Sequence, residues 1–129
     1  MSGYVQSNQT ITLPLGNYTV SSADTGKTLL IPAQGAAIIR LPNASLGLHY
    51  RFIMLGVATG TINITTGAAG GLRGVALTAN STVPITAAAT NVNFVNTAAD
   101  GDFIDAYCYS ATSWSISAGT QINAGITVT

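Results

Sequence analysis

The clearest pattern in the chain lies in residues 102–118, where apolar and polar side chains alternate with a period of two. Because successive side chains of a strand point to opposite faces, this alternation predicts a β-hairpin with its turn at residues 110–112. One face of the hairpin is small and apolar and consists of Ile104, Ala106, Cys108, Trp114, Ile116 and Ala118. The other face of its first strand carries Phe103, Asp105, Tyr107 and Tyr109. An outer face this rich in aromatic side chains indicates a surface that contacts more than water.

Shorter β-rich runs recur along the rest of the chain and are separated by residues typical of turns. The expected strands are 9–13, 17–21, 27–31, 36–41, 48–55, 61–65, 73–78, 82–86, 91–95 and 120–129. Helical patterns of about 10 to 15 residues between these runs are absent, which argues against parallel strands joined by helices. The pattern therefore predicts one all-β domain over residues 1–129, either an antiparallel β-sandwich or a jelly-roll-like barrel.

Three segments carry more specific expectations. Pro84 lies inside the run 82–86 and cannot donate a backbone hydrogen bond, so this run is the weakest strand and belongs at a strand end or a sheet edge. Residues 1–10 and 119–129 are polar and strand-like, which makes them candidate arms that pair with a neighbouring molecule.

The run 48–55 is apolar on both faces. Tyr50, Phe52 and Met54 share one face. His49, Arg51, Ile53 and Leu55 share the other. A strand of this kind is usually covered on both sides, so Arg51 is expected either to reach the rim of the sheet or to face an axis shared between copies.

Composition shifts the expectation towards an assembly. The chain has 129 residues, of which 47% are hydrophobic and only 6% charged, with a formal net charge of zero. A surface this neutral offers little electrostatic resistance to self-association. Its four basic residues are scattered, which argues against nucleic-acid binding, and no apolar run approaches the ~20 residues of a membrane span. The N-terminal residues lack the pattern of a secretory signal peptide.

Candidate catalytic and metal-binding residues are few. His49 and Cys108, the one histidine and the one cysteine, are expected on strands, but Cys108 points inward and no orienting Asn or Asp accompanies the pair. Residues 100–105 (DGDFID) hold most of the acids, yet they lack the glycine and glutamate positions of a calcium-binding loop. We therefore expect no enzyme activity, no metal and no cofactor, and a lone Cys108 cannot form an internal disulfide.

The aromatic face has two interpretations. Phe103, Tyr107 and Tyr109 are able to stack on sugar rings, or to fill an interface between subunits, where tyrosine is enriched and charge depleted. The scarcity of charge elsewhere favours the interface. The expected contact residues are Phe103, Tyr107, Tyr109, Arg51, Ile53 and His49. The expected core residues are Trp114, Ile104, Ile116, Tyr50 and Phe52.

Residues 41–118 carry a series of motifs: a Leu-Pro pair, a Gly-x-x-Tyr-x-Phe strand, an Ile-x-Ile strand and a Gly-Asp-x-Ile hairpin that includes a tryptophan. The positions are Leu41, Pro42, Gly47, Tyr50, Phe52, Ile62, Ile64, Gly101, Asp102, Ile104, Trp114 and Ile116. In this series the chain resembles small all-β structural proteins of phage and large algal DNA virus particles, namely capsid decoration, head-fibre and minor capsid proteins. It departs from them at residues 110–113, where the pattern usually has a glycine-containing turn.

The resemblance implies a non-enzymatic virion component, commonly a homotrimer, made in the host cytoplasm. Its implied partners are further copies of itself and the major capsid protein or another virion protein. A fibre tip that binds a receptor glycan is the alternative.

Overall fold

The computed structural model describes residues 10–66, 71–86 and 89–129. The expected N-terminal arm, apart from Thr10, lies outside these residues. Twelve strands and one short 3-10 helix make up the described chain. They are β1 (Thr10–Thr12), β2 (Tyr18–Thr19), η1 (Ser22–Asp24), β3 (Thr28–Pro32), β4 (Ala37–Arg40), β5 (His49–Leu55), β6 (Ile62–Thr65), β7 (Leu72–Leu77), β8 (Thr82–Ile85), β9 (Asn91–Phe94), β10 (Phe103–Cys108), β11 (Trp114–Gly119) and β12 (Ile126–Val128).

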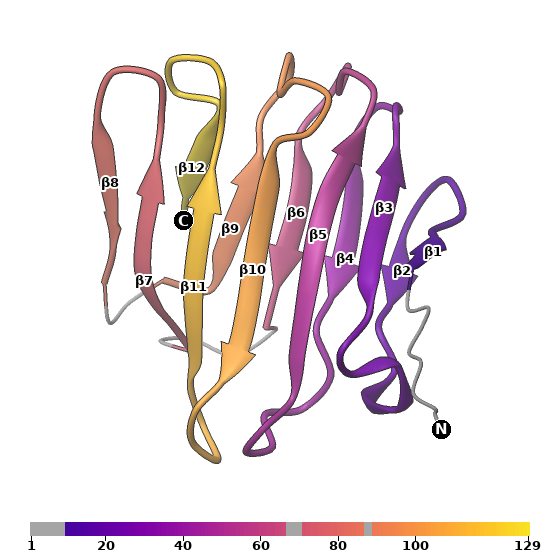
Figure 1. Cartoon of the computed structure of the whole chain (residues 1–129), viewed down its shortest axis with the longest axis vertical. Coiled ribbons are helices and arrows are strands. Elements are labelled where there is room, and N and C mark those ends of the chain that lie inside the picture. Colours follow the sequence, from indigo (N-terminus) through magenta and orange to yellow (C-terminus); the bar gives the residue numbers. More distant parts are fainter. Residues whose placement is uncertain (1–9, 67–70, 87–88) are drawn as a thin grey trace, which may run out of the picture.

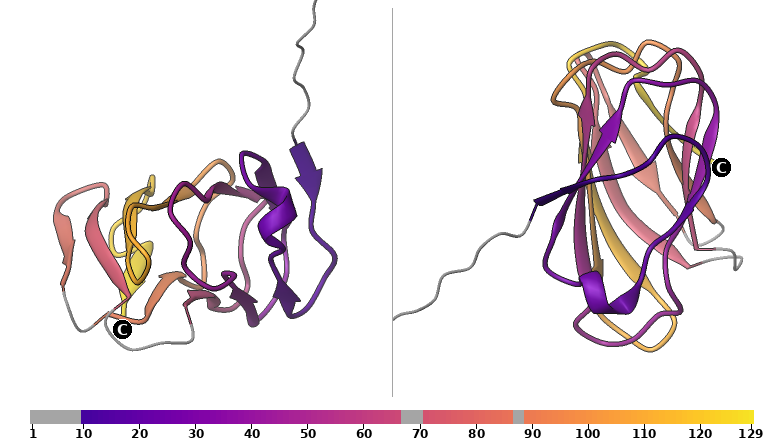
Figure 2. Two further views of the ribbon diagram at one scale, coloured as in Figure 1. Left: turned by 90° about the horizontal axis from the view of Figure 1, so that it is seen from below. Right: turned by 90° about the vertical axis from the view of Figure 1, so that its right-hand side faces the viewer.

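These strands form two sheets packed face to face (Figures 1 and 2). The seven-stranded sheet has the order β1-β3-β5-β10-β11-β7-β8, and the five-stranded sheet has the order β12-β9-β6-β4-β2. The prediction of an all-β sandwich is confirmed, and neither sheet closes into a barrel. The run around Pro84 is strand β8 at the edge of its sheet, where the missing N–H of proline costs no ladder hydrogen bond.

The expectation that the sheets would be antiparallel is wrong, because half of the strand pairings are parallel. In the seven-stranded sheet β1, β3 and β5 run parallel, with Thr10 opposite Thr28 and Thr28 opposite Arg51. In the other sheet β2, β4 and β6 do the same. Parallel neighbours need a crossover connection, which is usually a helix. Here the crossover is a strand of the opposite sheet, so the absence of helices did not exclude parallel pairing.

Two antiparallel pairings join the N-terminal strands β1–β6, whose own pairings are parallel, to the C-terminal strands. Strand β5 pairs with β10 in one sheet, and β6 pairs with β9 in the other. Strand β12, which lies within the expected C-terminal arm 119–129, pairs with β9 of the same chain.

The core lies between the sheets. Its largest fully buried side chains are Trp114, Phe52, Phe94, Leu29, Ile31, Ile39, Met54, Ile62, Ile64, Leu72, Ile104 and Ile116. The five residues expected in the core are all buried, Tyr50 among them at 2% exposure. Cys108 is also buried, and its thiol donates to the carbonyl of Ser110 at 3.1 Å. The alternation in the sequence therefore predicted correctly which face of the hairpin is internal.

Asp102 is a buried charged residue that fastens two loops. Its carboxylate accepts hydrogen bonds from the Ala99 N–H at 2.8 Å, the Thr120 hydroxyl at 2.6 Å and the Gln121 N–H at 2.9 Å. These donors come from the segments before β10 and after β11. A buried carboxylate is tolerated because its oxygens are satisfied in this way.

We predict that Asp102→Asn lowers the free energy of unfolding by about 2–3 kcal/mol, because an amide NH2 would face these donors. Asp100→Asn is the matched control. The Asp100 carboxylate accepts one hydrogen bond, from the Gly56 N–H at 2.7 Å, which an amide oxygen preserves. Urea denaturation of the three proteins tests this, and equal stability of Asp102→Asn and the unsubstituted chain would contradict it.

Candidate functional site

The six expected contact residues lie together on the outer face of the seven-stranded sheet, over the pairing of β5 with β10. The register places Ile53 opposite Phe103 and His49 opposite Tyr107. Arg51 lies between them, opposite Asp105. Tyr109 directly follows β10 and is exposed, as is Tyr107. The period-two pattern therefore placed these side chains on one face, and strand pairing brings the two halves of the set together.

An ion pair occupies the middle of this surface. The Arg51 guanidinium contacts both carboxylate oxygens of Asp105, at 2.7 and 3.1 Å, and lies 4.8 Å from the centre of the Phe103 ring. The main-chain bonds on either side of the pair place Arg51 and Asp105 at a non-hydrogen-bonded position, where opposing side chains are closest. Both side chains remain partly exposed, at 48% and 38%, so the pair adds little to stability. Its main effect is to hold the two charged side chains against each other through two hydrogen bonds.

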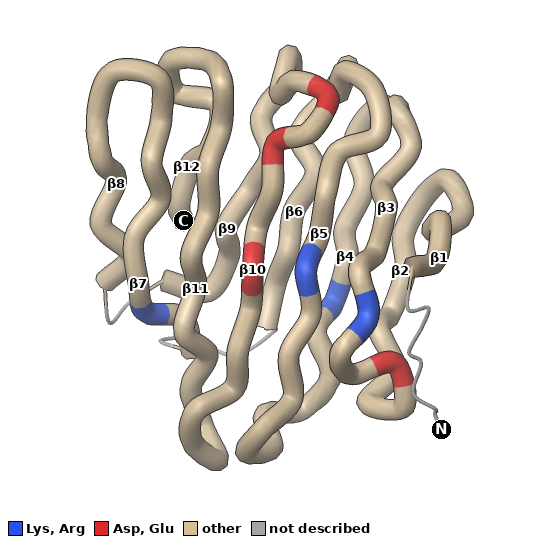
Figure 3. Tube along the Cα trace, in the orientation of Figure 1, with Lys and Arg blue, Asp and Glu red and all other residues tan. Residues whose placement is uncertain are grey.

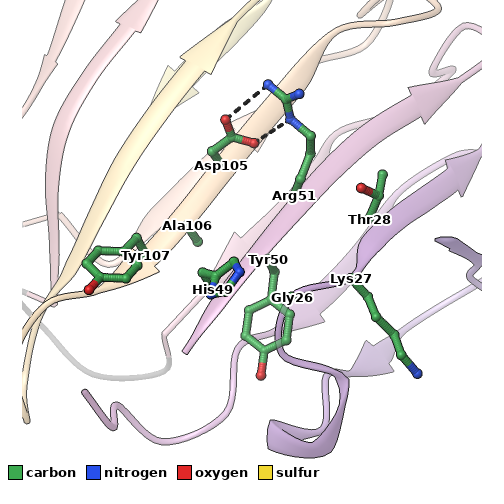
Figure 4. A pocket seen from close by; sticks show the side chains of 9 residues that line it. All are labelled: Gly26, Lys27, Thr28, His49, Tyr50, Arg51, Asp105, Ala106 and Tyr107. Carbon is green, nitrogen blue, oxygen red and sulfur yellow. Dashed lines mark hydrogen bonds and ion pairs between the residues drawn. The ribbon is translucent and has the colours of Figure 1, made fainter. Parts of the chain in front are cut away.

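Beside the ion pair lies an open depression of about 420 Å³ (Figure 4). It is lined by Gly26, Lys27, Thr28, His49, Tyr50, Arg51, Asp105, Ala106 and Tyr107. Lys27 is paired with Asp24 at 2.9 Å, so each charged residue of the lining has an opposite charge beside it. The charges around the depression are therefore balanced, which suits an uncharged partner rather than an ion.

Aromatic and imidazole rings form one side of the depression. His49 and Tyr107 lie with their ring centres 6.4 Å apart, and the Nδ1 atom of His49 is 3.2 Å from the carbonyl oxygen of Gly47. Both rings are exposed, Tyr107 at 47%. They offer flat apolar surface next to the hydrogen-bonding groups of Arg51 and Asp105.

The residues contributed by β3 and the turn before it were not expected at this site. Lys27 and Thr28 reach it because β3 runs parallel to β5, with Thr28 opposite Arg51. Sequence patterns place a residue on a face of its own strand but do not say which strand is its neighbour. The outer face also exposes Leu55, Val75 and Leu77, which extend the apolar surface along β5 and β7.

The groups considered for catalysis and metal binding are kept apart. Cys108 faces the core and His49 the outer surface. Of the clustered acids, Asp100 and Asp102 bind loop groups and Asp105 binds Arg51. Within residues 10–66, 71–86 and 89–129, no group of three or more His, Cys, Asp or Glu side chains is arranged to hold a metal ion. The charged residues are thinly spread over the described trace (Figure 3).

No family model, curated protein or solved structure matches this chain. Among the described residues, no helix has the length and apolar character needed to cross a bilayer. The site must therefore be interpreted from its own geometry.

Tyr50 underlies the depression and ties it to the N-terminal half. Its hydroxyl donates to the carbonyl of Ser21 at 3.0 Å. Burial, with smaller contributions from Asp24 and Cys108, raises the pKa of Tyr50 to about 12. The neutral phenol is thus the form that the fold stabilises.

We predict that stability falls as the pH rises from about 10 to about 12. Tyrosine in the unfolded chain ionises near pH 10, so the stabilisation from Tyr50 is complete below that pH and is lost as the pH rises through 12. Tyr50→Phe should reduce this dependence and, at neutral pH, cost about 1 kcal/mol for the lost hydrogen bond. Urea unfolding across this pH range measures both, with Tyr109→Phe as the exposed control. An unchanged pH slope in Tyr50→Phe would refute the assignment.

Proposed function

We propose that this chain is a non-enzymatic structural subunit that associates with further copies of itself through the outer face of the seven-stranded sheet. The observation that carries this proposal is the combination of exposed apolar side chains and paired charges over β5 and β10. Tyr107 and Leu55 are nearly half exposed, and the Arg51–Asp105 pair between them carries no net charge. Tyrosine and arginine, both exposed here, are residue types enriched in subunit interfaces.

The proposed setting is a virus particle, with the protein as a capsid decoration, cement or minor capsid component. Support for this setting comes from the motif series over residues 41–118, and the trimeric state is implied by the same resemblance. A stable contact of this class buries about 800 Å² on each partner. Repetition over a symmetric shell would turn individually weak contacts into lasting attachment to the major capsid protein.

We predict that Tyr107→Lys weakens self-association, raising the dissociation constant of the oligomer at least about tenfold, because an interface would have to desolvate the added charge. Ile38→Lys is the matched control, since Ile38 lies exposed on β4 of the opposite sheet. Sedimentation velocity over a concentration series measures both. A stable monomer for the unsubstituted chain at micromolar concentration, or equal effects of the two variants, would overturn the proposal.

A second candidate function is glycan binding at the depression beside Tyr107. The balanced Arg51–Asp105 pair offers donors and acceptors for sugar hydroxyls, and the exposed rings of Tyr107 and His49 offer surface for stacking on a pyranose. This arrangement suits a neutral sugar on a host receptor, as expected for a fibre tip.

For this candidate, we predict that Tyr107→Ala and Tyr109→Ala abolish binding to any glycan that an array identifies while the oligomeric mass stays unchanged. Each alanine removes a stacking surface without adding a charge. A glycan array that detects no binding to the unsubstituted chain removes this candidate.

A further inference from the structure

The five-stranded sheet ends in an unpaired strand edge at β12. Asn91 and Thr129 exchange two main-chain hydrogen bonds of 3.0 Å. From this pair onwards, hydrogen-bonded and non-hydrogen-bonded residue pairs alternate along β9 and β12. In an antiparallel ladder every second residue faces its partner, so the N–H and C=O groups of Ile126 and Val128 point away from β9. No main-chain group of the described residues bonds to them. This edge is ready to receive another strand.

The neighbouring edge of the seven-stranded sheet is protected. Thr78 and Ser81 close the β7–β8 turn with a main-chain hydrogen bond of 2.8 Å. The same alternation then directs the backbone of Thr82 and Pro84 outward, and Pro84 has no N–H to offer. An added strand would therefore pair with β12 rather than with β8.

An open groove of about 420 Å³ separates these two edges. It is lined by Thr78, Asn80, Ser81, Val83, Asn123, Ala124, Ile126, Thr127 and Val128. Val83 and Val128 are partly buried against the core, next to the buried Ile126. The groove therefore offers apolar contacts for alternate side chains of a strand, beside the free main-chain groups of β12.

We propose that residues 1–9 of a second copy of this chain occupy this groove and add to the edge of β12 as a strand. The segment reads MSGYVQSNQ and contains no charged residue and no proline. It includes Tyr4 and Val5, two residue types that favour strands. It leads into β1, which lies at the opposite end of the seven-stranded sheet from β8 (Figure 1).

The strand that adds to β12 must come from a second copy, because β1, to which residues 1–9 of the same molecule are joined, lies too far from the groove. From β1 to β8 there are six strand spacings, which at about 4.8 Å each amount to roughly 29 Å. Nine extended residues span at most about 30 Å. Residues 1–9 of the same molecule would therefore only just reach across the seven-stranded sheet, and no residues would be left to pair with β12. In this contact, residues 1–9 of one copy bind β12 of the next, which is a head-to-tail arrangement. Repeating it produces either a closed ring of copies or an open filament. It uses a different surface from the outer face discussed above.

The test compares the full chain with a variant that lacks residues 1–9, using sedimentation for mass and a labelled peptide of residues 1–9 for binding. The truncated protein should lose the head-to-tail contact and should bind the peptide. Val128→Pro in the truncated protein should weaken peptide binding at least about tenfold, because it removes one outward N–H. Val128→Ala, which keeps that N–H, is the matched control, and thermal unfolding checks that both variants fold.

Unchanged oligomeric mass after truncation would overturn this proposal, as would equal peptide binding to the Pro and Ala variants. Dissociation by Val128→Pro in the full chain but not by truncation would show that another strand, such as β12 of a second copy, occupies the edge. Tyr107→Lys should leave peptide binding unchanged, so failure of the outer-face contact is distinguishable from failure of this one.

Discussion

The pairing of β5 with β10 is the contact on which the rest of the molecule depends. On one side of it lie the strands β1 and β3, which run parallel to β5, and on the other lie β11, β7 and β8. Below it Phe52 and Ile104 are fully buried against the second sheet, and above it Arg51 and Asp105 form the ion pair. The same ten or so residues therefore build the core with one face and the candidate site with the other, which is a direct result of their period-two alternation.

This alternation explains how much could be predicted. The inward face of Ile104 and Trp114 and the outward face of Tyr107 follow from local side-chain order and agree with the structure. Most of the expected strands agree as well, but within the run 120–129 only Ile126–Val128 is a strand. The parallel pairing of β1 with β3 and β5, and of β2 with β4 and β6, could not be predicted in this way. Nothing in the sequence around Thr28 indicates that its neighbour is Arg51, because the intervening strand β4 lies in the other sheet and has the same local pattern as any hairpin strand. For that reason the contribution of Lys27 and Thr28 to the depression was missed.

Several of the few charged side chains are paired with each other or held by hydrogen bonds. Within the described residues, the ion pairs Lys27–Asp24 and Arg51–Asp105 both border the depression, while the Asp102 carboxylate accepts hydrogen bonds inside a loop junction. The surface above β5 and β10 therefore carries its charges as a pair, next to exposed tyrosine and leucine side chains. Both functions proposed for this surface, self-association and glycan binding, rest on this balance of charge.

The winding also has a mechanical consequence. Among the described strands, β7–β8 and β10–β11 are the consecutive pairs that stay within one sheet, and elsewhere the chain passes from one sheet to the other between successive strands. In a sandwich made mainly of hairpins, few chain segments cross between the sheets. One sheet can therefore slide along the other without stretching the backbone. Here sliding of the layers would stretch many backbone crossings at once, so shear along the strands is resisted by covalent bonds as well as by side-chain packing.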